Sequence, residues 1–154
     1  MEQGRVVRSG EGDPLPPFWL CKIGALTGGR FDFLVGEVPY LSGPPLHVHR
    51  DQDDTFFVLE GVLTIQLGEE VVDLGPGDFA TAPPGAPHTF DNIYPDRPAP
   101  KICNLMTPGG LDALFQDMAR MGAGAAGAPT FDELSQRHGF TLVGPTLGAK
   151  LGLA

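Results

Sequence analysis

Three histidines in the middle of the chain have the residue type and spacing of metal ligands. His47 and His49 are two residues apart, and residues two apart on a strand point to the same face of a sheet. His88 follows the turn-forming sequence PPGAP, which places it at the start of another strand. Three imidazoles with one carboxylate suit a divalent transition metal, because imidazole binds Zn, Cu, Fe and Ni and carboxylate helps with Fe and Mn.

The same histidines also admit an interpretation without a metal. A single histidine in a strand is usually a surface residue or a polar residue with a hydrogen-bond partner. Two inward-facing rings without a metal would each need partners, since burial of an unpaired polar group costs free energy. The residue types alone therefore leave open both a metal site and a structural cluster.

Length and composition indicate one strand-rich domain. The chain has 154 residues, the size of an ordinary domain, and 42% of them are hydrophobic, enough for a real core. Its 22 glycines and 16 prolines lie between apolar runs and are interpreted as turns.

Charge and cysteine content limit the partners and the compartment. The formal net charge is -9, and such a surface repels nucleic acid and anionic membranes, so we expect neither as a partner. The N-terminus lacks the apolar region of a secretory signal, and no apolar stretch approaches the ~20 residues that span a bilayer. Cys21 and Cys103 are expected to be reduced thiols of a cytoplasmic protein, with a single bridge between them as the alternative.

Short apolar runs bounded by Gly, Pro, Asn or Asp recur through the first two thirds of the chain. They are rich in Phe, Val, Ile and Thr, which is typical of an antiparallel sandwich or barrel. Gly68 and Glu69 predict a tight hairpin between two of the runs. The predicted strands lie at 18–26, 31–38, 56–59, 62–67, 71–74, 79–82, 89–93 and 101–106, with a further region around 47–49.

The pattern becomes helical after residue 108. Apolar residues recur at helical spacing from 111 to 118. Thr130 and Glu133 predict a capping box for a second helix that stops at Gly139, and 140–143 is a last strand or extended segment. We expect the two helices to pack outside the β-unit or to cover one end of it. The predicted division is an N-terminal arm at 1–17, a barrel at 18–107 and a helical extension at 108–154.

Two segments resemble the two motifs of the cupin family. The first, GPPLHVHRDQDDTFFVLEG, carries His47, His49, Asp54 and Gly61, and the second, GDFATAPPGAPHTFDN, carries Gly77, Pro83, Gly85, His88 and Asn92. The glycines of both motifs are expected at turns that need a positive φ. The whole chain is similar to the small single-domain, quercetin-dioxygenase-like cupins.

The resemblance implies an all-β fold, a cupin-type jelly-roll β-barrel with a short C-terminal helical extension. It implies one divalent transition metal (Fe, Mn, Ni, Cu or Zn) inside one mouth, with His47, His49, His88 and Asp54 as the ligands.

The carboxylate departs from the family pattern, which usually has Glu at this position. Asp54 is one methylene shorter, so its oxygens retreat by about 1.5 Å. It either ligates after a backbone shift, reaches the metal through a water, or leaves a three-histidine site with more open positions. Asp51 and Asp53 are rival carboxylates, or members of a solvated acidic loop.

The resemblance also implies an activity, a dioxygenase with a small aromatic or enediol-like substrate and Asp54 as the base. The alternatives are a non-redox isomerase or cyclase that uses the metal as a Lewis acid, and a small-molecule-binding cupin without turnover. The candidates for an apolar wall around the substrate are Phe33, Val35, Phe56, Val58 and Phe90.

A homodimer is expected as well. The family often dimerises, and Phe57 and Leu59 add an apolar alternate face to their strand.

Overall fold

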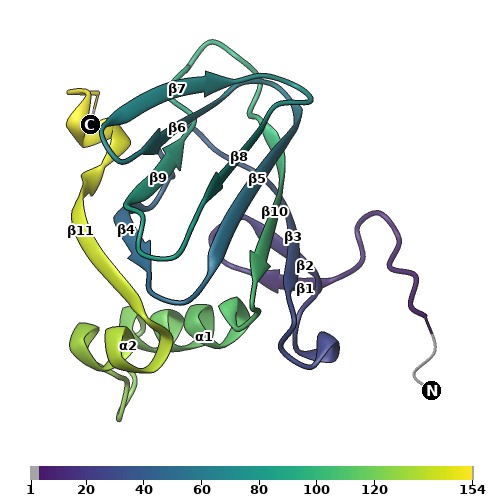
Figure 1. The fold of residues 1–154 in the computed structure, drawn as a ribbon, viewed down its shortest axis with the longest axis vertical. Coiled ribbons are helices and arrows are strands. Elements are labelled where there is room, and N and C mark those ends of the chain that lie inside the picture. The colour runs from purple at the N-terminus through teal and green to yellow at the C-terminus, as the bar shows by residue number, and fades with distance from the viewer. Residues whose placement is uncertain (1–3, 154) are drawn as a thin grey trace.

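The apolar runs form two antiparallel sheets that face each other as a jelly-roll barrel in a computed structural model, which describes residues 4–153 (Figure 1). One sheet has the strand order β1-β2-β3-β10-β5-β8 and the other β11-β4-β9-β6-β7. This confirms the predicted all-β fold. The strands are β1 Asp13–Leu15, β2 Trp19–Ile23, β3 Asp32–Glu37, β4 Pro45–His49, β5 Asp53–Glu60, β6 Leu63–Leu67, β7 Glu70–Leu74, β8 Phe79–Ala82, β9 His88–Asp91, β10 Lys101–Thr107 and β11 Phe140–Thr146.

The core lies between the sheets and follows the two-residue period of the strands. Leu34 of β3, Phe56 and Val58 of β5, and Ile102 and Met106 of β10 are all at most 1% exposed. Because every second residue of these strands points inward, the same strands can bring selected polar side chains into the interior.

The predicted hairpin between β6 and β7 is confirmed. Leu67 pairs with Glu70, so the loop consists of Gly68 and Glu69 alone. Gly68 has a φ of 59°, which glycine adopts without a steric cost.

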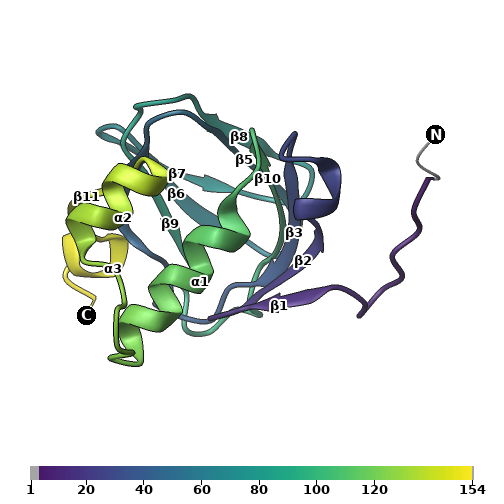
Figure 2. The same cartoon turned by 90° about the horizontal axis from the view of Figure 1, so that it is seen from below.

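The two predicted helices are α1, Leu111–Gly122, and α2, Phe131–His138. The capping box between Thr130 and Glu133 is present, and Gly139 ends α2 with a φ of 65°. Seen from below, α1 runs across one end of the barrel, so the helices cover an end (Figure 2). A short 3-10 helix, Ala25–Thr27, and a last short helix, α3 Leu147–Lys150, complete the elements.

Both segments outside the predicted barrel contribute a strand to it. Within 1–17, β1 pairs with β2, and it tolerates Pro14 because it is an edge strand. Within 108–154, β11 pairs with β4 along the other sheet. The sequence indicated 140–143 as a strand or extended segment, and pairing with a distant part of the chain extends it to Thr146.

Cys21 and Cys103 are free thiols, in agreement with the reduced state expected from the sequence. Among the described helices, none is both long enough and apolar enough to span a membrane.

A buried carboxylate fixes the position of α1 at its N-terminus. Asp32 Oδ2 on β3 accepts hydrogen bonds from the amides of Gly110 (2.7 Å) and Leu111 (2.6 Å). Asp32 is 2% exposed, so it caps the helix from another element and joins α1 to the six-stranded sheet.

Replacing Asp32 with leucine should therefore destabilise the protein. The Asp32→Leu variant leaves the amides of Gly110 and Leu111 without an acceptor, and each buried unpaired donor costs about 1–3 kcal/mol. We expect a loss of about 2 kcal/mol or more in the free energy of unfolding, measured by urea titration with Trp19 fluorescence.

The Asp32→Asn variant is the matched control. One oxygen accepts both bonds in the structure, and an amide oxygen can take its place, so we expect a loss of under about 1 kcal/mol. Equal losses in the two variants would contradict the capping role.

Candidate metal centre

The three histidines and Asp54 meet at the end of the barrel that α1 covers. His47 and His49 lie on β4, and His88 begins β9, where it pairs in register with His47. Asp54 comes from β5 of the opposite sheet. One donor atom from each residue lies within 4.8 Å of the others, and all four residues are buried. The structure thus brings together the four residues that the sequence singled out.

The turn before β9 sets the place of His88. Gly85 has a φ of 81° and donates its amide to the carbonyl of His49 at 2.8 Å. The amide of Ala86 closes the turn onto Pro83 at 3.0 Å. These bonds attach the turn to the strand that carries the other two histidines, so the three rings converge.

Backbone carbonyls orient two of the rings. His47 Nδ1 lies 2.8 Å from the carbonyl oxygen of Pro45, and His88 Nδ1 lies 2.8 Å from that of Ala86. A carbonyl oxygen only accepts, so each Nδ1 must carry the proton, which leaves Nε2 as the ligand atom. His49 Nδ1 is buried and has no hydrogen-bond partner.

The shorter carboxylate of Asp54 still reaches the cluster. Its Oδ2 lies 3.0 Å from His88 Nε2 and 3.6 Å from His49 Nε2. Its Oδ1 accepts a hydrogen bond from the side-chain amide of Asn104. Asp54 therefore bridges the two sheets.

The rival carboxylates lie elsewhere. Asp51 is exposed and forms an ion pair with Arg50 at 2.8 Å. Asp53 is half-buried, and strand alternation places it on the face of β5 opposite to Asp54.

Burial and mutual charge set the protonation of the cluster. Burial, followed by the neighbouring His88 and His49, lowers the pKa of His47 to about 3, so this ring stays neutral. Burial alone would raise the pKa of Asp54, but the His49 and His88 imidazoles outweigh it and hold that pKa well below its usual range. Burial likewise opposes the charge on His88, but Asp54 outweighs it and raises the pKa of His88.

The donor set fits a divalent transition metal. Neutral imidazole nitrogens and an ionised carboxylate, all buried and close together, are the ligands that such ions take. His47, His49 and His88 would hold the ion through their Nε2 atoms, and Asp54 Oδ2 would lie beside it as a fourth ligand or as a base.

A cavity of about 240 Å³ opens onto the cluster. Phe56 and Phe90 line it, as the sequence predicted, and α1 adds a side that was not predicted. Phe33 and Val35 were wrong as wall candidates, because β3 turns Asp32, Leu34 and Gly36 inward. Val58 is fully buried in the core and does not line the cavity. The contribution of α1 consists of Leu111, Leu114, Phe115 and Met118.

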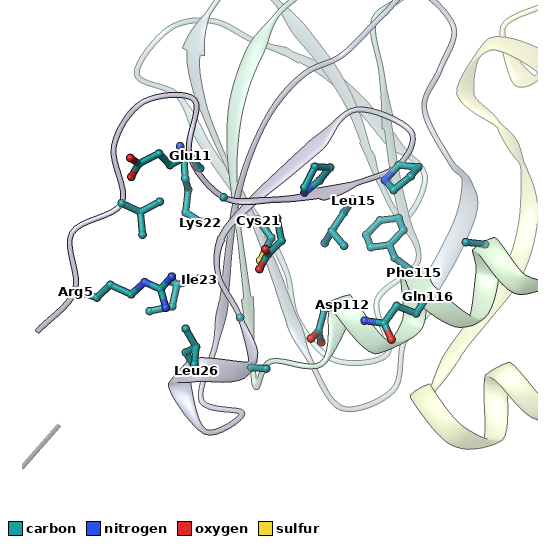
Figure 3. Close-up of a pocket in the computed structure, with 18 of the residues that line it drawn as sticks. Arg5, Glu11, Leu15, Cys21, Lys22, Ile23, Leu26, Asp112, Phe115 and Gln116 are labelled. Atoms are coloured by element: carbon teal, nitrogen blue, oxygen red, sulfur yellow. Dashed lines mark hydrogen bonds between the residues drawn. The ribbon is translucent and has the colours of Figure 1, made fainter. Parts of the chain in front are cut away.

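A larger groove of about 550 Å³ lies between the N-terminal segment and α1 (Figure 3). Of its two basic residues, Arg5 and Lys22, Lys22 donates to the backbone carbonyls of Arg8 and Glu11, so its charge holds the N-terminal segment in place. Burial raises the pKa of the Cys21 thiol to about 11, which keeps it protonated and unreactive. None of the four clustered residues lines this groove, so the chemistry centres on the smaller cavity.

Sequence reasoning missed Asn104. It lies on β10 between Ile102 and Met106, is 2% exposed and lines the cavity. The signal was a polar residue at an inward position of the run ICNLMT, where alternation places the core residues. Phe140 was also missed; its ring lies 5.1 Å from that of His47.

Comparison with known proteins agrees with this architecture. The family model described as "Cupin domain" matches residues 35–100. Quercetin 2,3-dioxygenase from Bacillus subtilis is 36% identical to this chain over 90 residues. That match covers 55% of this chain but 26% of the relative, so the chain spans about a quarter of that protein.

Solved structures show the same fold. KdgF from Halomonas sp. is 19% identical with a TM-score of 0.60, over 72% of this chain and 99% of that one. A conserved protein with a double-stranded β-helix domain from Klebsiella pneumoniae is 21% identical with a TM-score of 0.55, over 70% of this chain and 93% of that one.

The lowered pKa of His47 predicts how the metal-free protein responds to acid. In the unfolded chain His47 binds a proton when the pH falls below its ordinary pKa of about 6.5. In the folded chain the same residue stays neutral until about pH 3. Stability should therefore fall as the pH falls through this window, by up to about 1.4 kcal/mol per pH unit from this residue. Urea unfolding in the presence of EDTA measures the slope.

The His47→Gln variant lacks the titrating ring. Its unfolding free energy should fall less steeply between about pH 6 and pH 4 than that of the unmodified protein. If stability depends on pH equally in the two proteins, His47 takes up its proton over the same pH range in the folded and the unfolded chain, and its pKa is not lowered.

Proposed function

From the premise that this chain belongs to the cupin superfamily, we propose that it is a metal-dependent dioxygenase acting on a small aromatic or enediol-like substrate. The observation that carries the proposal is the convergence of three histidines and Asp54 on a mainly apolar cavity. The partial match to a quercetin 2,3-dioxygenase supports the same chemistry.

The cavity selects for a compact and largely apolar substrate. Its volume of about 240 Å³ lies below the ~300–1,000 Å³ of sites for drug-sized ligands. Phe56, Phe90 and the apolar side of α1 suit a flat ring and keep water away from it. We therefore favour a single-ring substrate.

Asp54 is the residue that handles a proton. Its 3.0 Å contact with His88 Nε2 requires a proton between the two atoms. With a metal held by His88 Nε2, that proton would be absent, and Asp54 Oδ2 could accept a hydrogen bond from a substrate hydroxyl and favour its anion. A bound Fe, Mn, Ni or Cu ion supplies the one-electron chemistry that dioxygen requires.

The metal content and oxygen uptake test this proposal. The protein purified without added metal should contain close to one Fe, Mn, Ni or Cu per chain by elemental analysis, and it should consume oxygen with a one-ring enediol or catechol. We expect His49→Ala and His88→Ala to lose the metal, and with it at least about a hundredfold of the oxygen uptake.

The fourth histidine of the chain provides the matched control. His138 lies on α2 and pairs with Asp117 at 2.9 Å, outside the cluster. The His138→Ala variant should keep both metal and activity. Zinc without oxygen uptake would favour the non-redox isomerase or cyclase instead, and the absence of any transition metal, even after loading, would contradict both enzymes.

We also propose that the protein forms a homodimer through the outer face of the six-stranded sheet. Phe57 of β5 and Phe79 of β8 pair in register, and they are 41% and 61% exposed. Leu59, two residues from Phe57, is 39% exposed on the same face. Adjacent exposed apolar side chains of this size are typical of protein interfaces.

Light scattering at micromolar concentration tests this contact. The mass should be twice the 16.3 kDa of one chain. The double variant Phe57→Lys with Phe79→Lys should be monomeric, because desolvating the added charges opposes association. Phe131→Lys is the control, since Phe131 is equally exposed (58%) but lies on α2. A monomeric unmodified protein would contradict the proposal.

A further inference from the structure

Among the described residues, two buried side-chain polar atoms have no hydrogen-bond partner, and both belong to residues that line the cavity. They are His49 Nδ1 and Asn104 Oδ1. A buried acceptor without a partner costs about 1–3 kcal/mol, and the apolar neighbours of Asn104 on β10 show that an apolar residue fits this strand face. An asparagine at this position therefore lowers stability relative to an apolar residue, and we expect it to have a function that offsets this loss.

Chemistry fixes the orientation of the Asn104 amide. Its Nδ2 lies within hydrogen-bond distance of Asp54 Oδ1 and 3.1 Å from the carbonyl oxygen of Thr55. The carbonyl oxygen of Thr55 can only accept a hydrogen bond, and the same amide atom of Asn104 contacts both partners. The NH₂ group must therefore face them, and Oδ1 is left as a buried acceptor without a partner on a residue that lines the cavity.

The same amide controls which oxygen Asp54 offers. Since Asn104 occupies Oδ1, the other oxygen, Oδ2, is the one that lies beside His88 and His49. The hydrogen bond from Asn104 to Oδ1 thus fixes the orientation of the short Asp54 side chain, so that only Oδ2 faces the histidines.

We propose that Asn104 is a positioning residue that holds Asp54 through Nδ2 and accepts a hydrogen bond from the substrate through Oδ1. The substrate then carries a hydroxyl or amino donor next to the group that faces the histidines. This inference rests on the proposed function for its site, and it narrows the substrate class to compact rings with two adjacent polar groups, of which at least one donates.

Binding to zinc-loaded protein tests the acceptor without turnover. Catechol has two adjacent hydroxyls, whereas 2-methoxyphenol has one of them blocked by a methyl group. Titration calorimetry should show that the unmodified protein binds catechol about tenfold more tightly, the discrimination expected of one buried hydrogen bond.

Two variants on the same face of β10 separate the hydrogen bond from the packing. Asn104→Leu removes the amide and should reduce the preference for catechol to under about twofold, and it should raise the zinc dissociation constant about tenfold because Asp54 is no longer held. Ile102→Leu, two residues earlier on the same inward face of β10 but outside the cavity lining, should leave both values unchanged. If the leucine variant does not fold, Asn104→Val, whose side chain has no hydrogen-bonding atom, should show the same loss of preference.

An unmodified protein without the catechol preference, or an Asn104→Leu variant that keeps it, would overturn the acceptor role. An unchanged zinc dissociation constant in Asn104→Leu would overturn the hold on Asp54. This test does not depend on the dioxygenase activity, because it measures binding to zinc-loaded protein, which does not turn over. If the iron-loaded protein consumes no oxygen while the zinc-loaded protein still prefers catechol, the dioxygenase proposal is rejected and the role of Asn104 is retained.

Discussion

A buried contact between Asp54 of one sheet and His88 of the other is the interaction on which the functional end of this barrel depends. Both side chains are almost fully removed from water, and neither charge would be tolerated there alone. The five-stranded sheet carries the three imidazoles and the six-stranded sheet carries the carboxylate, so the buried polar groups of each sheet find their partners on the other. Because these buried polar groups must contact each other, they fix the position of one sheet relative to the other at this end of the barrel. Apolar packing alone would not impose so specific an alignment.

The predictions that succeeded relied on local patterns. Alternation in a strand was enough to place His47 and His49 on one face, and the turn chemistry of PPGAP was enough to place His88 at the start of a strand. The strand-length apolar runs likewise indicated the all-β fold, and Thr130 and Glu133 indicated where α2 begins. In each case a few neighbouring residues determine the structure without help from the rest of the chain.

The predictions that failed or were missing concerned contacts between distant segments. The inward phase of β3, which excluded Phe33 and Val35 from the cavity, depends on what the strand packs against. The choice of α1 to cover the cavity depends on Asp32, almost eighty residues earlier in the chain. Asn104 had a visible signal, a polar residue among core positions, but its meaning required knowing that Asp54 would lie beside it.

The pairing of β11 with β4 has a consequence for how this fold can be divided. Phe140 pairs with His49 and Leu142 with His47, so the last strand buttresses the very strand that presents two imidazoles. The stretch that matches the cupin model ends forty residues earlier, at 100. The stretch that the family model matches is therefore shorter than the unit that holds the candidate ligands in place. A fragment cut at the borders of that match would carry all four ligands but would leave β4 as an unpaired edge strand.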